Sequence, residues 1–162
     1  MQSREIGISI IVCSYNGESK ISKTLQHILE QKITQPIKWE LVFVDNNSTD
    51  NTNDIVLAYS KQFRQRGVNV KILAENKKGK YYALNLAIAH AQYAYFIIVD
   101  DDNWLDRKYV QTAFQLIHNN PNIGAIGCKS EAVFGDDVTL IPNWFYDNPE
   151  RLAIGTQGVD GN

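Results

Sequence analysis

Short apolar runs alternate along the chain with segments whose apolar residues recur at helical spacing. The runs at residues 6–13 and 96–99 are apolar and rich in β-branched residues, as strands buried on both faces are. The run at 39–44 is mainly apolar, the run at 68–73 alternates apolar and polar residues, and the run at 123–128 consists of small and apolar residues. The predicted strands cover residues 6–13, 39–44, 68–73, 96–99 and 123–128. The segments between them carry apolar residues on one face each, which is typical of amphipathic helices. The predicted helices run at about 18–31, from 52 up to Gly67, at 80–91 and at 105–119.

This alternation predicts the fold class. Strands that alternate with helices form parallel sheets with right-handed crossovers, so we expect an α/β fold with a mainly parallel, Rossmann-like sheet and flanking helices. In such sheets ligands bind beyond the carboxyl ends of the strands. The first, second and fourth predicted strands all lead into polar clusters, at residues 14–16, at Asp45 and at residues 100–102. We therefore expect a binding site at that edge.

The fourth predicted strand ends in three consecutive aspartates, Asp100, Asp101 and Asp102. Like charges repel, and burial would raise the cost of each charge further. A divalent cation such as Mg²⁺ or Mn²⁺ would offset this repulsion, because hard cations bind carboxylate and phosphate oxygens. If the extended conformation continues, Asp100 and Asp102 share one side and Asp101 faces the other. The alternative for the triplet alone is a solvated acidic turn that caps the next helix.

Other polar residues at this edge have two interpretations each. Asp45 could accept hydrogen bonds from the base or ribose of a nucleotide, or it could cap the turn that follows it. Asn16 and Glu18 could contact a ligand or cap the first helix. Gly79 and Lys80 could bring backbone and a cation near a phosphate, or they could belong to a solvated loop.

Composition and charge narrow the class of protein. The chain has 162 residues, 44% hydrophobic and 21% charged, with a net charge of −2, which suits a globular domain with a real core. It has no large basic block, so we expect no nucleic acid partner. No apolar run is long enough to span a bilayer, and the N-terminus lacks the layout of a signal peptide. Cys13 and Cys128 have no metal-type spacing and are predicted to be reduced and buried, so we expect a cytoplasmic protein.

Several familiar motifs are absent from the sequence. No G-x-G-x-x-G follows the first strand, and no Walker-type G-x-x-x-x-G-K-[ST] appears, so neither a dinucleotide fold of the usual kind nor a P-loop is supported. A receiver domain would need an acidic pair after the first strand, where this chain has Ser14 and Asn16.

Four blocks of the sequence resemble, in order and spacing, the bacterial family 2 glycosyltransferases with the glycosyltransferase A-type fold. These blocks are SIIVCSYNGE, ELVFVDNNSTDNT, ENKKGKYYALNLAI and YFIIVDDDNWLD, and the resemblance covers residues 8 to about 128. It implies an enzyme that moves a sugar from a nucleoside-diphosphate sugar donor to a hydroxyl of a saccharide or lipid-linked acceptor, with inversion. It also implies a divalent metal, Mn or Mg, and a role in cell-surface polysaccharide or glycolipid synthesis.

The resemblance implies roles for individual residues as well. Asp100 and Asp102 match the metal-binding D-x-D motif, with Asp102 as the direct ligand, and Asp45 matches the acidic residue that contacts base or ribose. Lys80 lies in the block that places a basic residue near the nucleotide, although the family commonly has arginine where this chain has Leu84. The residues expected around the nucleotide are Ser14, Tyr15, Asn16, Glu18, Asp45, Lys80, Asp100 and Asp101.

We predict two parts in this chain. Residues 1–130 form the nucleotide-sugar-binding domain, and residues 131–162 begin an acceptor-side region of a longer, truncated enzyme. Because the family's carboxylate base usually lies well after the D-x-D motif, the base is expected beyond Asn162, and the full-length protein could sit at the inner face of the membrane. Two alternatives remain open: a nucleotide-sugar binding module without turnover, and a sugar-phosphate nucleotidyltransferase.

Overall fold

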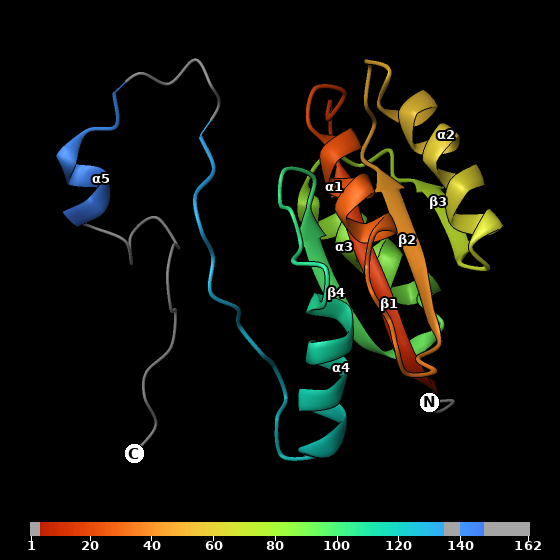
Figure 1. Cartoon of the computed structure of the whole chain (residues 1–162). Helices are drawn as coiled ribbons and strands as arrows, with labels where there is room; N and C mark the ends of the chain where they lie inside the picture. Colours follow the sequence, from red (N-terminus) through yellow and green to blue (C-terminus); the bar gives the residue numbers. More distant parts are fainter. Residues whose placement is uncertain (1–3, 135–139, 148–162) are drawn as a thin grey trace. The chain divides into compact units, whose positions relative to one another are not determined.

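The computed structural model describes residues 4–134 and 140–147 of the chain (Figure 1). Two compact units divide it, Met1–Asn119 and Asn120–Asn162. In the first unit strands and helices alternate as β1 (Glu5–Ser14), α1 (Ile21–Leu29), β2 (Trp39–Asp45), α2 (Thr52–Gln65), β3 (Asn69–Ala74), α3 (Lys80–His90), β4 (Tyr93–Asp100) and α4 (Tyr109–Asn119). In the second unit the described helix is α5 (Asn143–Asp147).

The four strands form one parallel sheet in the order β3-β2-β1-β4. Strand β1 is central, and its consecutive apolar residues Ile10, Ile11 and Val12, which point to alternate faces of the sheet, are all completely buried. A parallel strand covered on both faces needs such a continuous apolar run, since neither of its sides reaches water. The predicted α/β class with a mainly parallel sheet is therefore confirmed.

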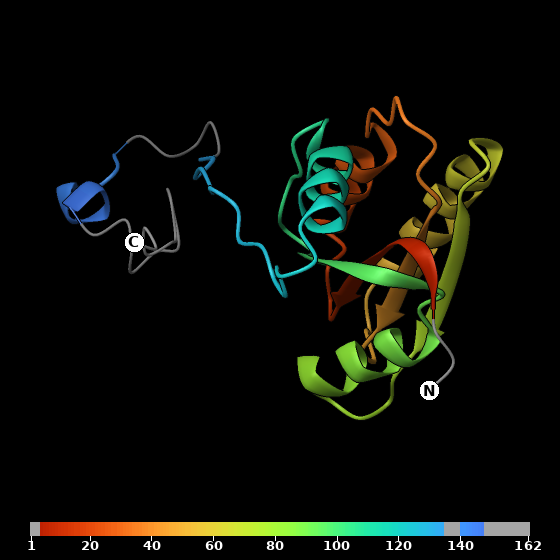
Figure 2. The same ribbon diagram turned by 90° about the horizontal axis from the view of Figure 1, so that it is seen from below.

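Helices cover both faces of this sheet (Figure 2). Helices α1, α2 and α4 pack on one face, where Leu25, Val56 and Val110 belong to a single buried cluster with the sheet. Helix α3 covers the other face through Ala83 and Ala87, whose small side chains allow the helix to approach closely. The result is a three-layer arrangement in which only loops remain at the two ends of the strands.

The strand register brings three polar chain segments to one end of the sheet. Ser14 at the end of β1 is opposite Asp45 at the end of β2, and Cys13 is opposite Asp100 at the end of β4. Because all the strands run in the same direction, their carboxyl ends meet at this edge. The expected convergence of the first, second and fourth strands is thus confirmed.

Helix α4 begins at Tyr109 instead of at residue 105 as predicted. The segment before it is held in a non-helical conformation by contacts with other parts of the chain. The backbone carbonyl of Asp106 accepts a hydrogen bond of 2.6 Å from Nε2 of Gln31. The carboxylate of Asp106 accepts one of 2.8 Å from the backbone N–H of Lys108, a short-range contact that favours a helix start just beyond it.

The predicted fifth strand is wrong. Residues 123–128 form no strand, and their side chains are exposed, with Ile123 at 37% and Ile126 at 38%. The segment consists largely of glycine, alanine and cysteine, which supply little apolar surface, and a strand needs a neighbouring strand for its backbone hydrogen bonds. The compact units divide after Asn119. The functional boundary at residue 130 stays a prediction. The functions predicted for the two parts stay predictions.

No helix within the described ranges combines the length and apolar character needed to cross a bilayer.

The predicted burial of the cysteines is wrong for Cys128, which is exposed, and only partly right for Cys13, which is half-buried. Trp144 is 57% exposed in α5.

A buried carboxylate lies toward the opposite end of the strands from the polar edge. Glu40 is fully buried, and its Oε1 accepts hydrogen bonds from Oγ of Ser9 at 2.8 Å and from the backbone N–H of Gln92 at 2.6 Å. Its Oε2 lies 2.9 Å from Nζ of Lys71, which also donates to the carbonyl of His90. A buried charge persists only when it is paired and hydrogen-bonded in this way.

Candidate functional site

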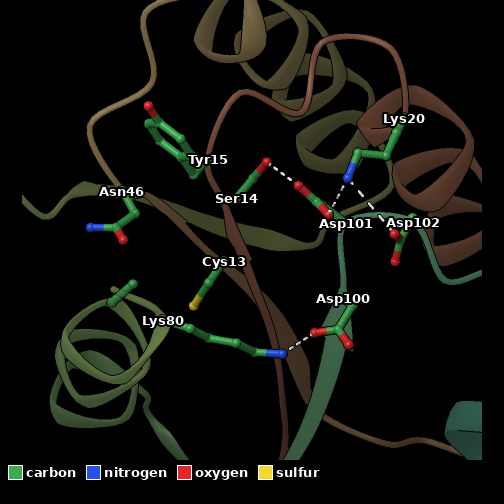
Figure 3. Close-up of a pocket in the computed structure, with 10 residues that line it drawn as sticks. Cys13, Ser14, Tyr15, Lys20, Asn46, Lys80, Asp100, Asp101 and Asp102 are labelled. Carbon is green, nitrogen blue, oxygen red and sulfur yellow. Dashed lines mark hydrogen bonds and ion pairs between the residues drawn. The ribbon is translucent and has the colours of Figure 1, made fainter. Parts of the chain in front are cut away.

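A pocket of about 300 Å³ lies at the edge where β1, β2 and β4 end, a volume at the lower limit of small-molecule sites (Figure 3). Six of the residues predicted for the site lie around it, and four further residues were not predicted. The lining residues are Cys13, Ser14, Tyr15, Lys20, Asn46, Lys80, Ala83, Asp100, Asp101 and Asp102. The predicted residues outside the lining are Asn16, Glu18 and Asp45.

Asp100, the last residue of β4, pairs with Lys80, the first residue of α3 (Figure 3). Lys80 can start the helix there because Gly79 before it has a φ of 127°, which side chains rarely allow. The hydrogen bond to Asp100 raises the pKa of Lys80, because it stabilises the charged ammonium group. The extended conformation ends at Asp100, and residues 101–102 form a turn, so the predicted alternation of the three aspartates does not apply.

Asp101 and Asp102 share a different lysine, Lys20, at the start of α1 (Figure 3). Nζ of Lys20 lies 3.5 Å from Oδ1 of Asp101 and 3.7 Å from Oδ2 of Asp102. Asp101 also accepts a hydrogen bond from Oγ of Ser14. A Cβ on Gly17 would lie 2.2 Å from that Oγ, so only glycine fits beside this contact. Asp101 is therefore tied to the protein on two sides.

Asn16 and Glu18 join the loop after β1 to the loop after β2. Oδ1 of Asn16 accepts a hydrogen bond of 2.8 Å from the backbone N–H of Thr49. The carboxylate of Glu18 accepts from the backbone N–H of Asn51 at 3.2 Å and from its Nδ2 at 2.8 Å. Helix α1 begins later, at Ile21, without a side-chain cap, so the interpretation of these residues as its caps is wrong. Their contact with a nucleotide stays a prediction.

Asp45 occupies the capping position that we considered as its alternative role. The residue is only 6% exposed, and its two carboxylate oxygens lie 3.2 and 3.3 Å from the backbone N–H of Ser48, which donates to them. This contact explains why a carboxylate is tolerated at the buried end of β2. The predicted contact of Asp45 with a base or ribose is compatible with it, because a carboxylate has further lone pairs, and it stays a prediction.

Asn46 was missed by the sequence interpretation and holds the loop that leads into α3. Its Nδ2 donates to the carbonyls of Glu75 at 3.0 Å and Lys77 at 2.8 Å, and its Oδ1 accepts from the backbone N–H of Gly79 at 2.8 Å. These bonds fix the position from which Lys80 reaches the pocket. An asparagine directly after a strand that ends at the ligand edge was the available signal, since its amide both donates and accepts.

Tyr15 presents an aromatic surface beside basic residues. It lines the pocket and is 50% exposed, and Nζ of Lys78 lies 5.9 Å from the centre of its ring. On the same loop, Nζ of Lys77 lies 3.9 Å from the ring centre of Tyr82. An open aromatic face next to ammonium groups suits a ligand that combines a planar base with phosphates.

Cys13 lines the pocket but is held in its neutral form. Burial raises the pKa of its thiol from 9.0 to about 11, against a smaller opposing effect of Lys80. Because the thiolate is the nucleophile and metal ligand, a thiol with this pKa serves neither purpose at neutral pH. Cys13 therefore contributes to the shape of the pocket more than to its chemistry.

This pKa predicts slow alkylation. At pH 8 a thiol with a pKa of about 11, as in the folded chain, contains about a hundredfold less thiolate than a thiol with the ordinary pKa of 9.0. We expect iodoacetamide to modify Cys13 about a hundredfold more slowly in native buffer than in urea, measured by mass spectrometry of peptides. The exposed Cys128 is the internal control and should react readily in both conditions. Equal rates for Cys13 in the two conditions would contradict the raised pKa.

The donor atoms around the pocket fit a hard divalent cation. Asp100 and Asp102 offer carboxylates whose side chains are 46% and 56% exposed, so a cation can reach them. Oxygen donors of this kind match Mg²⁺ and Mn²⁺. Among the described residues, no three carboxylate, imidazole or thiol groups are already gathered around one point. Lys20 and Lys80 are instead the positive charges that face the aspartates.

Lys20 was also missed by the sequence interpretation. The only available signal was its place in the turn between the first strand and the first helix, on the side where ligands bind in such sheets. Its contacts with residues about eighty positions later depend on how β1 and β4 pair.

Comparisons with known proteins agree with this geometry. The family model described as Glycosyl transferase family 2 matches residues 9–154. The chain is 33% identical over 115 residues to WfgD of Escherichia coli, named as a UDP-Glc:alpha-D-GlcNAc-diphosphoundecaprenol beta-1,3-glucosyltransferase, and the match covers 70% of this chain and 42% of WfgD. The mannosyltransferase PcManGT from Pyrobaculum calidifontis, solved with GDP-Man and Mn²⁺, is similar with a TM-score of 0.66 and 29% identity, over 78% of this chain and 36% of that one.

The structure of TarS from S. aureus in complex with UDP is similar with a TM-score of 0.60 and 27% identity, over 70% of this chain and 32% of TarS. The chain spans less than half the length of the curated relatives that it matches. These structures confirm the predicted glycosyltransferase A-type fold. Since the family model matches most of the sequence, from the central strand to beyond α5, this chain belongs to glycosyl transferase family 2.

Proposed function

We propose that this chain supplies the nucleotide-sugar donor site of a metal-dependent, inverting glycosyltransferase. The observation that carries the proposal is the pocket at the carboxyl ends of the strands, where three aspartates, two lysines and an exposed tyrosine meet. Its place in the fold is the one where open α/β sheets bind ligands. Family membership favours glycosyl transfer over the nucleotidyl transfer that the sequence left open.

The chemistry of the lining residues fits a nucleoside diphosphate. Tyr15 offers a ring face for the base, and Asp45 lies at the end of the neighbouring strand with lone pairs for base or ribose. Lys80 and Lys20 supply ammonium groups suited to phosphate oxygens. The similar structures of PcManGT with GDP-Man and of TarS with UDP support a donor of this class.

Asp100 and Asp102 would hold the divalent cation, because their carboxylates are the most accessible of the acidic groups in the pocket. When bound, the cation would neutralise charge on the departing diphosphate. Asp101, tied to Ser14 and Lys20, would keep the turn after β4 in place. Thr24 supports the same turn, since its Oγ1 donates a hydrogen bond of 2.9 Å to the carbonyl of Asp101.

The acceptor is proposed to be a saccharide or a lipid-linked saccharide, as the name of WfgD indicates for that relative. Inversion requires a carboxylate that removes the proton from the acceptor hydroxyl, and this base is expected outside the residues of the donor pocket. The protein would then act in the synthesis of a cell-surface polysaccharide or glycolipid.

The proposal predicts metal-dependent nucleotide binding. Titration calorimetry with UDP, GDP and dTDP, each with and without Mn²⁺, is expected to show one diphosphate that binds at least about tenfold more tightly with the metal, a difference of about 1.4 kcal/mol. The matching nucleoside monophosphate is the control and should lose most of the metal effect, because it lacks the second phosphate. The absence of binding by all three diphosphates in the presence of Mn²⁺ would contradict the proposed function.

A further inference from the structure

Lys20 bridges two of the three aspartates in the pocket. Its Nζ lies 3.5 Å from Asp101 and 3.7 Å from Asp102, while Lys80 pairs separately with Asp100 (Figure 3). Every carboxylate of the triplet therefore faces an ammonium group. Two positive charges so close reduce the repulsion that three neighbouring carboxylates would otherwise suffer.

These ion pairs also keep the carboxylates apart. Asp100 is drawn toward α3, and Asp101 and Asp102 are drawn toward the start of α1 (Figure 3). In the part of the chain that the structure describes, no three potential metal-binding groups are gathered together. Lys20 and a divalent cation are both positive and both favour the carboxylate of Asp102, so the presence of one at this carboxylate weakens the binding of the other.

The side chain of Lys20 can move away from the aspartates. Its side chain is 45% exposed, and its ammonium is carried on a flexible four-carbon stem, so it can move without a change in the backbone. Asp101, in contrast, also accepts a hydrogen bond from Ser14 that does not involve Lys20. A diphosphate in the pocket would offer Lys20 a new anionic partner close by, since both lysines line the same pocket.

We propose that Lys20 is an exchangeable internal cation of the donor site. In the free protein it neutralises Asp101 and Asp102 and lowers the affinity of the site for a divalent cation. When a nucleoside diphosphate enters, the ammonium group moves to the phosphates and frees Asp102. Metal and donor then bind together, and neither binds tightly alone. This role of Lys20 as a positioning residue depends on the proposed function of the pocket.

The test measures Mn²⁺ affinity directly, from the electron paramagnetic resonance signal of free Mn²⁺. Lys20→Met removes the charge and keeps most of the stem, and we expect it to bind Mn²⁺ without nucleotide about two- to fivefold more tightly than the parent, the scale of a partly exposed ion pair. With UDP or GDP present, the gain in Mn²⁺ affinity that the nucleotide causes should be smaller in this variant than in the parent.

Two further variants separate this role from a general charge effect. Lys23→Met makes the same change of charge three residues later, in the first turn of α1, but Nζ of Lys23 lies over the ring of Trp104, 4.7 Å from its centre. It should bind Mn²⁺ like the parent. Lys20→Arg keeps the charge and should restore the parent's lower affinity. Thermal melts without metal should show that all three variants are folded.

The outcomes distinguish the two proposals. If the parent binds Mn²⁺ with nucleotide, and Lys20→Met binds Mn²⁺ no more tightly than Lys23→Met, the role of Lys20 is overturned and the proposed function stands. If neither the parent nor any variant binds Mn²⁺, with UDP or GDP or without them, both proposals are overturned. A tighter Mn²⁺ complex in Lys20→Met alone, reversed in Lys20→Arg, supports the exchange.

Discussion

Replacement of Asp102 by asparagine is expected to abolish metal-dependent nucleotide binding and to leave the fold intact. Asp102 lies in the turn after β4 with its side chain 56% exposed, and its only described polar contact is the ion pair with Lys20. The substitution keeps the shape of the side chain and removes the charge that would bind a cation. Replacing a residue that only supports a metal ligand already lowers metal affinity by about 10- to 100-fold. We therefore expect a loss of about a hundredfold when a direct ligand is replaced.

The matched control is Asp106→Asn. Asp106 lies four positions further along, is exposed, and accepts a hydrogen bond from the backbone N–H of Lys108, a role that asparagine can also fill. The same charge is removed near the same turn, but outside the pocket lining. In calorimetric titrations with nucleoside diphosphate and Mn²⁺, we expect the affinity of Asp102→Asn to be about a hundredfold lower than that of Asp106→Asn. Parent-like affinity in Asp102→Asn would show that this carboxylate is not a metal ligand.

Replacement of Glu40 by alanine is expected to destabilise the fold by about 2–5 kcal/mol, because it leaves buried donors unsatisfied and the partly buried Lys71 without its carboxylate. Glu40 is fully buried, and its loss leaves Oγ of Ser9 and the backbone N–H of Gln92 without their acceptor. It also leaves Lys71 beside an empty space instead of a carboxylate. Because the free energy of unfolding of small domains is only about 5–15 kcal/mol, this loss should appear as a large shift of the urea concentration at the unfolding midpoint.

Two variants serve as controls for this effect. Glu40→Gln keeps one acceptor oxygen for Ser9 and should lose less stability than Glu40→Ala. Glu30→Ala removes an exposed partner of Arg107, at 3.0 Å, and should leave the free energy of unfolding nearly unchanged. An unfolding midpoint for Glu40→Ala equal to that of the parent would mean that the buried pair does not stabilise the sheet.

The hydrophobic pattern was sufficient for most of the fold. The four strands of the sheet and the helices between them lie close to their predicted positions, because each buried element needs an apolar run or stripe of its own length. The prediction failed at residues 123–128, where small residues resembled a buried strand but had no neighbouring strand to pair with. Periodicity describes one segment at a time, whereas strand formation depends on a second segment.

The candidate site was predicted in its position more reliably than in its contacts. Asp100, Asp101 and Asp102 were expected beside Ser14 and Tyr15, and they are found there, because parallel strands bring their carboxyl ends to one edge. Lys20 and Asn46 were missed, and Asn16 and Glu18 turned out to join two loops. Side-chain partners in loops are set by backbone turns that a pattern of apolar residues does not describe.

The sequence alone thus specifies a parallel α/β sheet, its family, and an acidic cluster at the carboxyl edge of that sheet. These properties follow from the apolar runs that mark buried segments and from the order of the segments, and both can be read directly from the sequence. The pairing of Lys20 with Asp101 and Asp102, and of Lys80 with Asp100, arises only in the folded protein. Those contacts join residues that are far apart in the chain, and they form because β1 and β4 are neighbours and the chain turns at Asp101.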